Sequence, residues 1–201
     1  MRNIKIGLDF DNTLINYDSV FYEVALSKGL ITKNLAKSKL KIRDYLRSQG
    51  KDNDFSYMQG EVYGPSIHMA KESTNMISAL NKLKNKNIEI IIVSHKTVKP
   101  YIGPPYNLRE YAMNWLETKG FFSKEGLNWP KNKVYFESTK EEKVSRIVKE
   151  NCTHYVDDLI EILEMIPQNI NRIQFDNKNL KKWQKGPSFS DWNELEDILD
   201  I

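Results

Sequence analysis

The sequence predicts an α/β fold with a mainly parallel sheet and a small α-helical insertion. Apolar, β-branched runs at 4–8 and 88–93 are typical of buried strands, and the second run is nearly continuous, as in a strand covered on both faces. Helical patterns alternate with these runs, which favours βαβ units. The interval of about 55 residues before the helix near residue 74 is longer than one crossover needs, and it indicates an inserted subdomain.

Further strands are predicted where short apolar runs end in polar residues. These runs are KVYFES, THYVDD and NRIQF, at 133–138, 153–158 and 171–175. The segment 176–191 has a loop-like composition. Five strands of a mainly parallel sheet therefore follow from the sequence.

Three helices are predicted between the strands by their apolar spacing and end signals. The first, at 73–86, has Ser73 or Thr74 as a candidate N-cap. The second, at 107–120, begins with Asn107 as the cap and ends at Gly120. The third, STKEEKVSRIVKEN at 138–151, opens with a capping box, in which a Ser or Thr is followed three residues later by Glu.

The inserted subdomain is predicted to cover residues 17–72. Helical pieces near 19–28, 34–48 and 55–71 are divided by glycine-containing breaks. The core is then formed by residues 1–16 and 73–201.

The composition is that of an ordinary globular protein and disfavours several classes of partner. A net charge of +3 in 201 residues is too small to favour nucleic acid or an anionic membrane. No apolar run approaches a membrane span, and the first residues lack a secretory signal. Cys152 is the only cysteine, which fits a reducing compartment. We expect a cytoplasmic protein; a homo-oligomer is compatible with the sequence but not indicated by it.

Two aspartates follow the first strand and are candidates for chemistry. Because alternate residues of a strand point to the same side, Asp9 and Asp11 can face one site while Phe10 points to the core. Carboxylates held together need a cation or a shared proton between them. Mg²⁺ suits such oxygen ligands and the phosphate groups of a substrate.

Other polar residues occur at the ends of later strands. Ser94 ends the second run, and the pair Asp157 and Asp158 ends the fourth. Ligands of parallel α/β sheets bind beyond the carboxyl ends of the strands. Lys143 or Lys140, on the helix between the third and fourth runs, completes a set suited to Mg²⁺ and a phosphoryl group.

The ordered set resembles the motifs of the haloacid dehalogenase (HAD) superfamily, in its phosphatase branch. DFDNT is similar to the first motif, IIIVSH to the second, KEEK to the lysine motif and YVDD to the acidic fourth motif. The resemblance covers residues 4–13 and about 74–160. It implies a Rossmann-like, HAD-type three-layer fold in which the insertion is a small helical cap.

The resemblance also implies roles for these residues. Asp9 is then the nucleophile that forms an aspartyl-phosphate, and Asp11 is the general acid and base. The residues implied to hold Mg²⁺ are Asp9, Asp11 through its main-chain carbonyl, Asp157 and Asp158. Those implied to hold the phosphoryl group are Thr13, Ser94 and the lysine.

Several assignments stay open at this point. Lys143 is favoured over Lys140 by its distance from the last strand, and Asp158 is equally suited to be a metal ligand or a helix N-cap. His95 is a hypothesis for phosphate binding because it follows Ser94. Weak candidates for substrate contact, from loops with aromatic and small residues, are Gln59, Tyr63 and Arg109.

The function predicted is a Mg²⁺-dependent phosphatase that acts on a small phosphorylated metabolite such as a sugar phosphate. A nucleotidase or a nucleic-acid end phosphatase is the alternative, although the low net charge disfavours the latter. A receiver-like signalling domain fits poorly, because the third run offers no aspartate as phosphoacceptor. Intact Asp9 and Asp11 disfavour an inactive binding protein.

Overall fold

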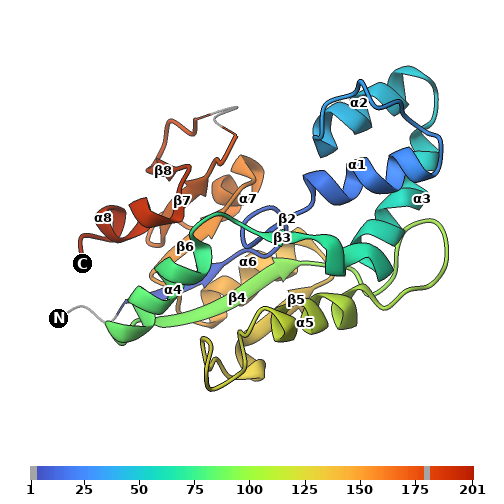
Figure 1. Cartoon of the computed structure of the whole chain (residues 1–201). Helices are drawn as coiled ribbons and strands as arrows, with labels where there is room; N and C mark the ends of the chain where they lie inside the picture. Colours follow the sequence, from blue (N-terminus) through green and yellow to red (C-terminus); the bar gives the residue numbers. More distant parts are fainter. Residues whose placement is uncertain (1–3, 179–181) are drawn as a thin grey trace. The chain divides into compact units, whose positions relative to one another are not determined.

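The structure, a computed structural model, describes residues 4–178 and 182–201 (Figure 1). The chain divides into two compact units. The sheet unit comprises Met1–Ile15, Glu72–Lys96 and Gly120–Ile201, and the helical unit comprises Asn16–Lys71 and Thr97–Lys119.

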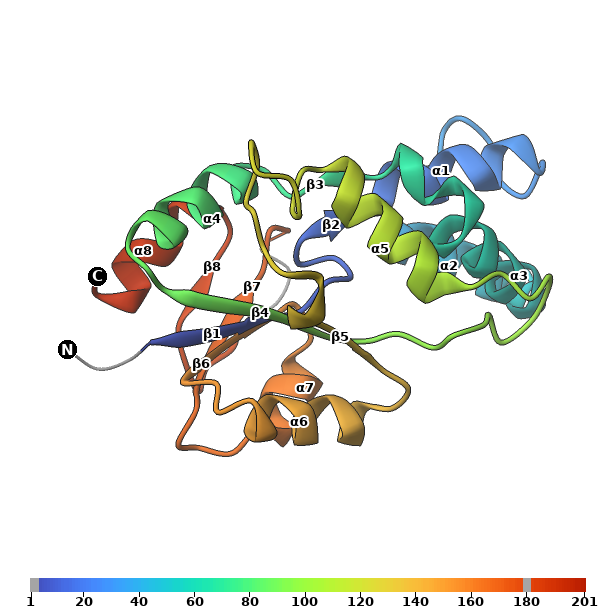
Figure 2. The same cartoon turned by 90° about the horizontal axis from the view of Figure 1, so that it is seen from below.

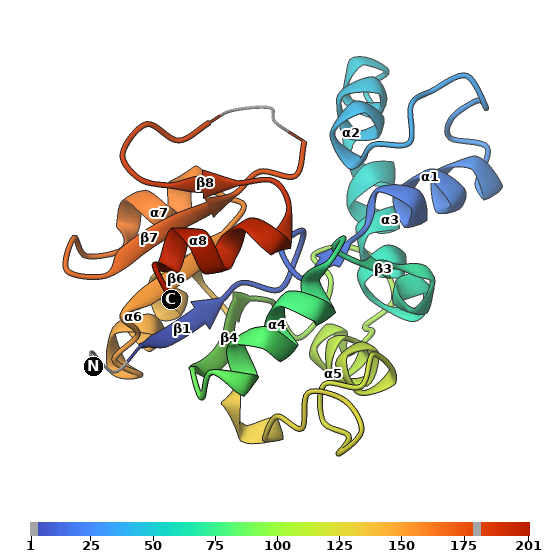
Figure 3. The same cartoon turned by 60° about the vertical axis from the view of Figure 1, so that its left-hand side comes forward.

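The sheet unit contains a six-stranded sheet in the order β5-β4-β1-β6-β7-β8, in which every neighbouring pair is parallel and the last strand, β8, is Ser188–Phe189. Figure 3 shows β8, β7, β6, β1 and β4 following one another from top to bottom. The five predicted strands are confirmed, as β1 (Lys5–Leu8), β4 (Glu89–His95), β5 (Val134–Glu137, preceded by the short helix η2, Lys131–Lys133), β6 (His154–Asp157) and β7 (Asn171–Phe175).

Helices cover both faces of this sheet. Figure 2 shows α4 (Met76–Asn85) and α8 (Leu195–Leu199) on one face, and α6 (Lys140–Lys149) and α7 (Ile160–Met165) on the other. The short helix η3 (Trp192–Glu194) leads into α8. Apolar side chains from β4, α6, β6 and α7 form a buried cluster between the sheet and the second pair of helices. The predicted α/β, Rossmann-like three-layer fold is confirmed.

The ends of the predicted helices are partly as expected. The Thr139 hydroxyl accepts from the Glu142 N–H, and the Glu142 carboxylate accepts from the Thr139 N–H, so the capping box is present. The predicted cap of the first helix is wrong. Asn75, in the left-handed conformation, precedes α4, while the Ser73 hydroxyl donates 2.6 Å to the main-chain carbonyl of Thr13. Ser73 is therefore used to fix the turn after β1.

The expectation of a loop at 176–191 is also partly wrong. Ser188–Phe189 forms β8, which pairs in parallel with Gln174 and Phe175 of β7. Residues 179–181 of the predicted loop lie outside the described residues. The strand is short, and the polar, glycine- and proline-containing sequence before it hides its apolar signal.

The helical unit contains the inserted helices. These are α1 (Asp18–Ser27), α2 (Lys39–Ser48), α3 (Asp52–Tyr63) and the short helix η1 (Pro65–Met69). Its interior is aromatic: the Phe21 and Phe55 rings stack at 5.6 Å, and Tyr63 packs edge-on against Tyr17. A two-stranded ribbon of β2 (Ile15–Asn16) and β3 (Lys71–Glu72) lies where the chain passes between the units along the sequence.

The boundaries of the units differ from the predicted ones in one segment. The predicted core included α5 (Leu108–Thr118), but the structure groups Thr97–Lys119 with the helical unit. Trp115 of α5 is buried and donates from its indole nitrogen to the Ala70 carbonyl at 3.0 Å. The apolar face of α5 thus packs within the helical unit, and the connection from β4 to β5 passes through that unit. Among the described residues, no helix has both the length and the apolar character that crossing a membrane requires.

Candidate functional site

The first motif lies in a tight turn at the carboxyl end of β1. The strand ends at Leu8, and the Asp9 N–H continues its pairing by donating 2.9 Å to the Val156 carbonyl. Asn12 then adopts a left-handed conformation with φ of 60°, which asparagine tolerates well, and the Leu14 N–H returns to the Phe10 carbonyl. Phe10 is fully buried, as predicted. Strand alternation therefore ends before Asp9, and the turn decides where each aspartate points.

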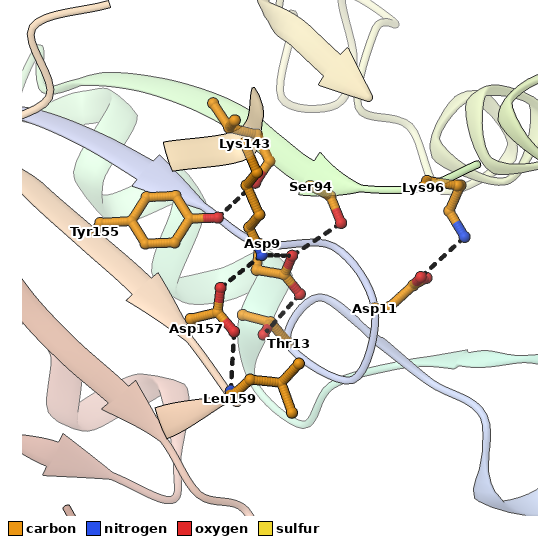
Figure 4. A network of polar contacts seen from close by, with 10 residues as sticks. Asp9, Asp11, Thr13, Ser94, Lys96, Lys143, Tyr155, Asp157 and Leu159 are labelled. Carbon is orange, nitrogen blue, oxygen red and sulfur yellow. Dashed lines mark hydrogen bonds and ion pairs between the residues drawn. The ribbon is translucent and has the colours of Figure 1, made fainter. Parts of the chain in front are cut away.

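Asp9 lies at the centre of a buried group of polar side chains (Figure 4). Its Oδ1 accepts from the Ser94 hydroxyl at 2.8 Å and from the Lys143 ammonium at 2.6 Å. Its Oδ2 accepts from the Thr13 hydroxyl at 3.4 Å, a long contact. Oδ2 is thus the more weakly held of the two oxygens.

Lys143 bridges two carboxylates in the interior. Its Nζ lies 2.6 Å from both Asp9 Oδ1 and Asp157 Oδ2, and Asp157 Oδ1 accepts from the Leu159 N–H at 2.9 Å. Burial would lower the pKa of Lys143, but the charges of Asp157 and Asp9 raise it above its ordinary value. Burial and the nearby charge of Asp9 raise the pKa of Asp157, against the opposing effect of Lys143. The shift of Lys143 thus follows from the two carboxylates around it, and that of Asp157 follows mainly from its burial.

Three carboxylates could hold a metal ion together. Oxygens of Asp9, Asp157 and Asp158 lie within 4.8 Å of one another. Three carboxylates that offer oxygen atoms this close together suit a divalent cation. Asp158 is not the N-cap of α7, because Leu159 occupies that position and makes no side-chain cap bond. The carboxylate of Asp11 does not belong to the metal group.

The two candidate lysines of α6 are clearly separated by their surroundings. Lys143 is 2 % exposed and contacts Asp9 and Asp157. Lys140, at the start of the same helix, pairs with Glu161 at 2.6 Å on the surface. The structure therefore places Lys143, and not Lys140, beside the aspartates.

Asp11 forms a separate ion pair with a lysine that the sequence analysis did not select. Lys96 is buried, and its Nζ lies 3.0 Å from Asp11 Oδ2, while the Asp11 side chain is 23 % exposed. Figure 4 shows this pair set apart from the group around Asp9. Lys96 stands two residues after Ser94 at the end of β4, and that spacing was the available signal.

Tyr155 packs against Lys143 of the Asp9 group, and the sequence analysis did not select it either. Its hydroxyl donates to the Val93 carbonyl at 2.5 Å, and the Lys143 ammonium lies 5.6 Å from the centre of its ring. A Cβ at Gly7, on the strand between, would lie 2.6 Å from Tyr155 Cδ2. The ring therefore crosses β1 where glycine leaves room. Its position two residues before Asp157 in β6 was the signal.

The remaining candidates lie elsewhere. The His95 ring approaches the main-chain carbonyl of Ser138 at 3.1 Å, and no described contact joins it to Asp9. Gln59 and Tyr63 belong to α3 and Arg109 to α5, all in the helical unit. Tyr63 packs against Tyr17, as described above, so its ring has a role in that unit's interior.

Comparisons with known proteins identify the fold. No family model matches the sequence, and no curated protein is significantly similar to it. Solved structures match over almost the whole chain. A HAD-superfamily hydrolase from Ehrlichia chaffeensis is 15% identical, with a TM-score of 0.54, over 100% of this chain and 98% of that one.

Two further structures are similar over their full length. The L-2-haloacid dehalogenase RSc1362 is 8% identical with a TM-score of 0.61, and 100% of both chains is covered. The Bacillus subtilis protein YfnB, described as a HAD-hydrolase bound to magnesium, is 11% identical with a TM-score of 0.54 and the same coverage. The chain therefore has the fold of the HAD-superfamily hydrolases.

Proposed function

We propose that the chain is a Mg²⁺-dependent phosphatase that hydrolyses small phosphorylated metabolites, such as sugar phosphates, through an aspartyl-phosphate at Asp9. The observation that carries the proposal is the buried group in which Ser94, Thr13 and Lys143 surround the Asp9 carboxylate. Hydroxyl and ammonium donors at these positions suit the oxygens of a phosphoryl group.

In this proposal each step is performed by a residue of the turn after β1. An oxygen of Asp9, for which the weakly held Oδ2 is the candidate, attacks phosphorus, and the bond to the ester oxygen breaks. Asp11 gives its proton to the leaving oxygen. Asp11 then takes a proton from water, which attacks the aspartyl-phosphate, releases phosphate and restores the Asp9 carboxylate.

The carboxylates of Asp9, Asp157 and Asp158 fit the Mg²⁺ that this chemistry uses. Their spacing within 4.8 Å supports this ligand set, with the main-chain carbonyl of Asp11 as a further candidate. Bound Mg²⁺ would supply positive charge to the phosphoryl oxygens. One similar structure, YfnB, is described as bound to magnesium.

The side chain of Asp11 favours phosphatase over dehalogenase chemistry, although a dehalogenase is among the similar structures. A departing halide needs no proton, whereas a departing alkoxide does. Asp11 is partly exposed beside the buried Asp9 and can supply that proton. The helical unit is proposed to act as the cap that selects the substrate.

Phosphate release from p-nitrophenyl phosphate, with Mg²⁺ and with EDTA, tests the proposal. We expect turnover only with the metal, and loss of at least about 1,000-fold in kcat for Asp9→Asn. The exposed Asp197→Asn is the control and should keep wild-type activity. A broad panel of phosphate esters and a halide-release assay with 2-chloropropionate should accompany it. No phosphate release from any ester by the wild type would contradict the proposal.

A further inference from the structure

We propose that Lys96 makes the site selective for phosphate esters whose leaving group carries a negative charge close to the ester oxygen. This inference rests on the proposed function and deepens it, because it concerns the part of the substrate that departs. It assigns Lys143 to the phosphoryl group and Lys96 to the leaving group, on the two sides of the bond that breaks.

The main chain holds Lys96 firmly in place. Its N–H donates 2.8 Å to the Glu137 carbonyl, so the pairing of β4 with β5 continues beyond the last residue of β4. Its ammonium lies 5.4 Å from the centre of the Phe10 ring and 3.0 Å from Asp11 Oδ2. The charge is therefore fixed between the end of β4 and the turn after β1.

The contact with Asp11 sets an upper limit on the distance from the Lys96 ammonium to the leaving oxygen of the substrate. In the proposed mechanism the leaving oxygen receives its proton from Asp11 and lies at hydrogen-bond distance from that carboxyl group. An oxygen bonded to Asp11 Oδ2 then lies no more than about 6 Å from Lys96 Nζ, since Oδ2 itself is 3.0 Å from Nζ. The oxygens of a carboxylate attached one carbon away lie about 3 Å further along the leaving group, and so no more than about 9 Å from Nζ.

At this distance a charge on the leaving group interacts strongly with Lys96. The Lys96 side chain is only 2 % exposed, and charges withdrawn from water attract one another more strongly than charges on the surface. Lys143 contributes to the phosphoryl side instead, because it contacts Asp9 and Asp157. A neutral leaving group gains little from Lys96, whereas an anionic one gains binding and a more stable departing oxygen.

The test compares two esters of similar size, of which only one has a charged leaving group. These are 2-phosphoglycolate, whose leaving group carries a carboxylate, and 2-hydroxyethyl phosphate, which has an uncharged hydroxymethyl group in its place. We expect the wild type to have at least about a 10-fold higher kcat/KM for the charged ester. Lys96→Met should reduce this ratio to about 1–3, and Lys96→Arg should keep most of it.

The exposed Lys99→Met is the matched control, because it removes a positive charge that lies three residues further along the chain and faces solvent; its ratio should equal that of the wild type. An equal kcat/KM for the two esters in the wild type, which needs no variant, would overturn the inference. So would an unchanged ratio in folded Lys96→Met. Turnover without preference overturns this inference alone, whereas no phosphate release from any ester overturns the proposed function and the inference together.

Discussion

Lys143 and Lys96 are both buried beside aspartates at the carboxyl end of the sheet, but their surroundings differ. Lys143 is enclosed between Asp9 and Asp157, which are themselves buried. Lys96 meets Asp11, whose side chain is 23 % exposed. The enclosed lysine contributes to both the stability of the core and the proposed phosphoryl site. Lys96, whose partner Asp11 is more exposed, is proposed to interact with the leaving group of the substrate.

The largest effect on stability and activity is expected for Lys143→Met, and a much smaller one for Lys140→Met in the same helix. Lys143→Met would leave two buried carboxylates without their shared cation, so the free energy of unfolding should fall by about 3–5 kcal/mol. Phosphatase kcat should fall by about 100-fold or more. Lys140→Met removes a surface pair and should change stability by less than about 1 kcal/mol. Urea unfolding and phosphate release measure both quantities, and equal effects of the two variants would contradict the assignment of Lys143.

A smaller effect is expected from Gly7 and Tyr155. The Tyr155 ring packs against Lys143 and not against Lys96. Gly7→Ala would place a Cβ 2.6 Å from Tyr155 Cδ2 and 3.1 Å from Cys152 Sγ, so the ring must move. We expect a loss of about 1–3 kcal/mol in the free energy of unfolding and a lower kcat. Combining it with Tyr155→Leu should cost less than the sum of the single variants. Additive costs would show that the ring does not pack over Gly7.

The smallest effect is a dependence of stability on pH that arises from Asp157. Because burial raises its pKa, the folded chain keeps a proton that the unfolded chain has lost. Without divalent cation, the contribution of Asp157 to the free energy of unfolding should therefore fall by about 1–2 kcal/mol between pH 4 and 7. Burial lowers the pKa of His154, which gives an opposite trend. The Asp157→Asn variant keeps His154 and its trend. The difference in the free energy of unfolding between the wild type and this variant therefore isolates the contribution of Asp157. A difference in the free energy of unfolding, wild type minus Asp157→Asn, that increases from pH 4 to pH 7 would contradict the account.

The positions of five strands and most of the candidate site residues were accessible from the sequence because they depend on local patterns. Apolar runs ending in Asp9, Ser94 and Asp157 predicted which strand ends carry polar groups, and parallel strands bring such ends together. The Thr139 capping box placed the helix that carries Lys143. These features need only the period of the strand or helix and its end signals.

The remaining features depend on packing that no local pattern records. The turn at Asn12 directs Asp9 and Asp11 to different lysines, although alternation predicted one shared site. Tyr155 matters because glycine on the neighbouring strand admits its ring. The place of α5 in the helical unit follows from the burial of Trp115 among residues distant in sequence.

The central claim is that Asp9 becomes phosphorylated, while Asp11 protonates the leaving oxygen and then takes a proton from the attacking water. Asp11→Asn removes the group that activates water, so the intermediate should accumulate. The most direct measurement is mass spectrometry of this variant after acid quenching with p-nitrophenyl phosphate and Mg²⁺. The account predicts the mass of one added phosphoryl group on the peptide containing Asp9, and none in Asp9→Asn. Phosphate released at the wild-type rate by either variant, or a phosphoryl group on another residue, would contradict it.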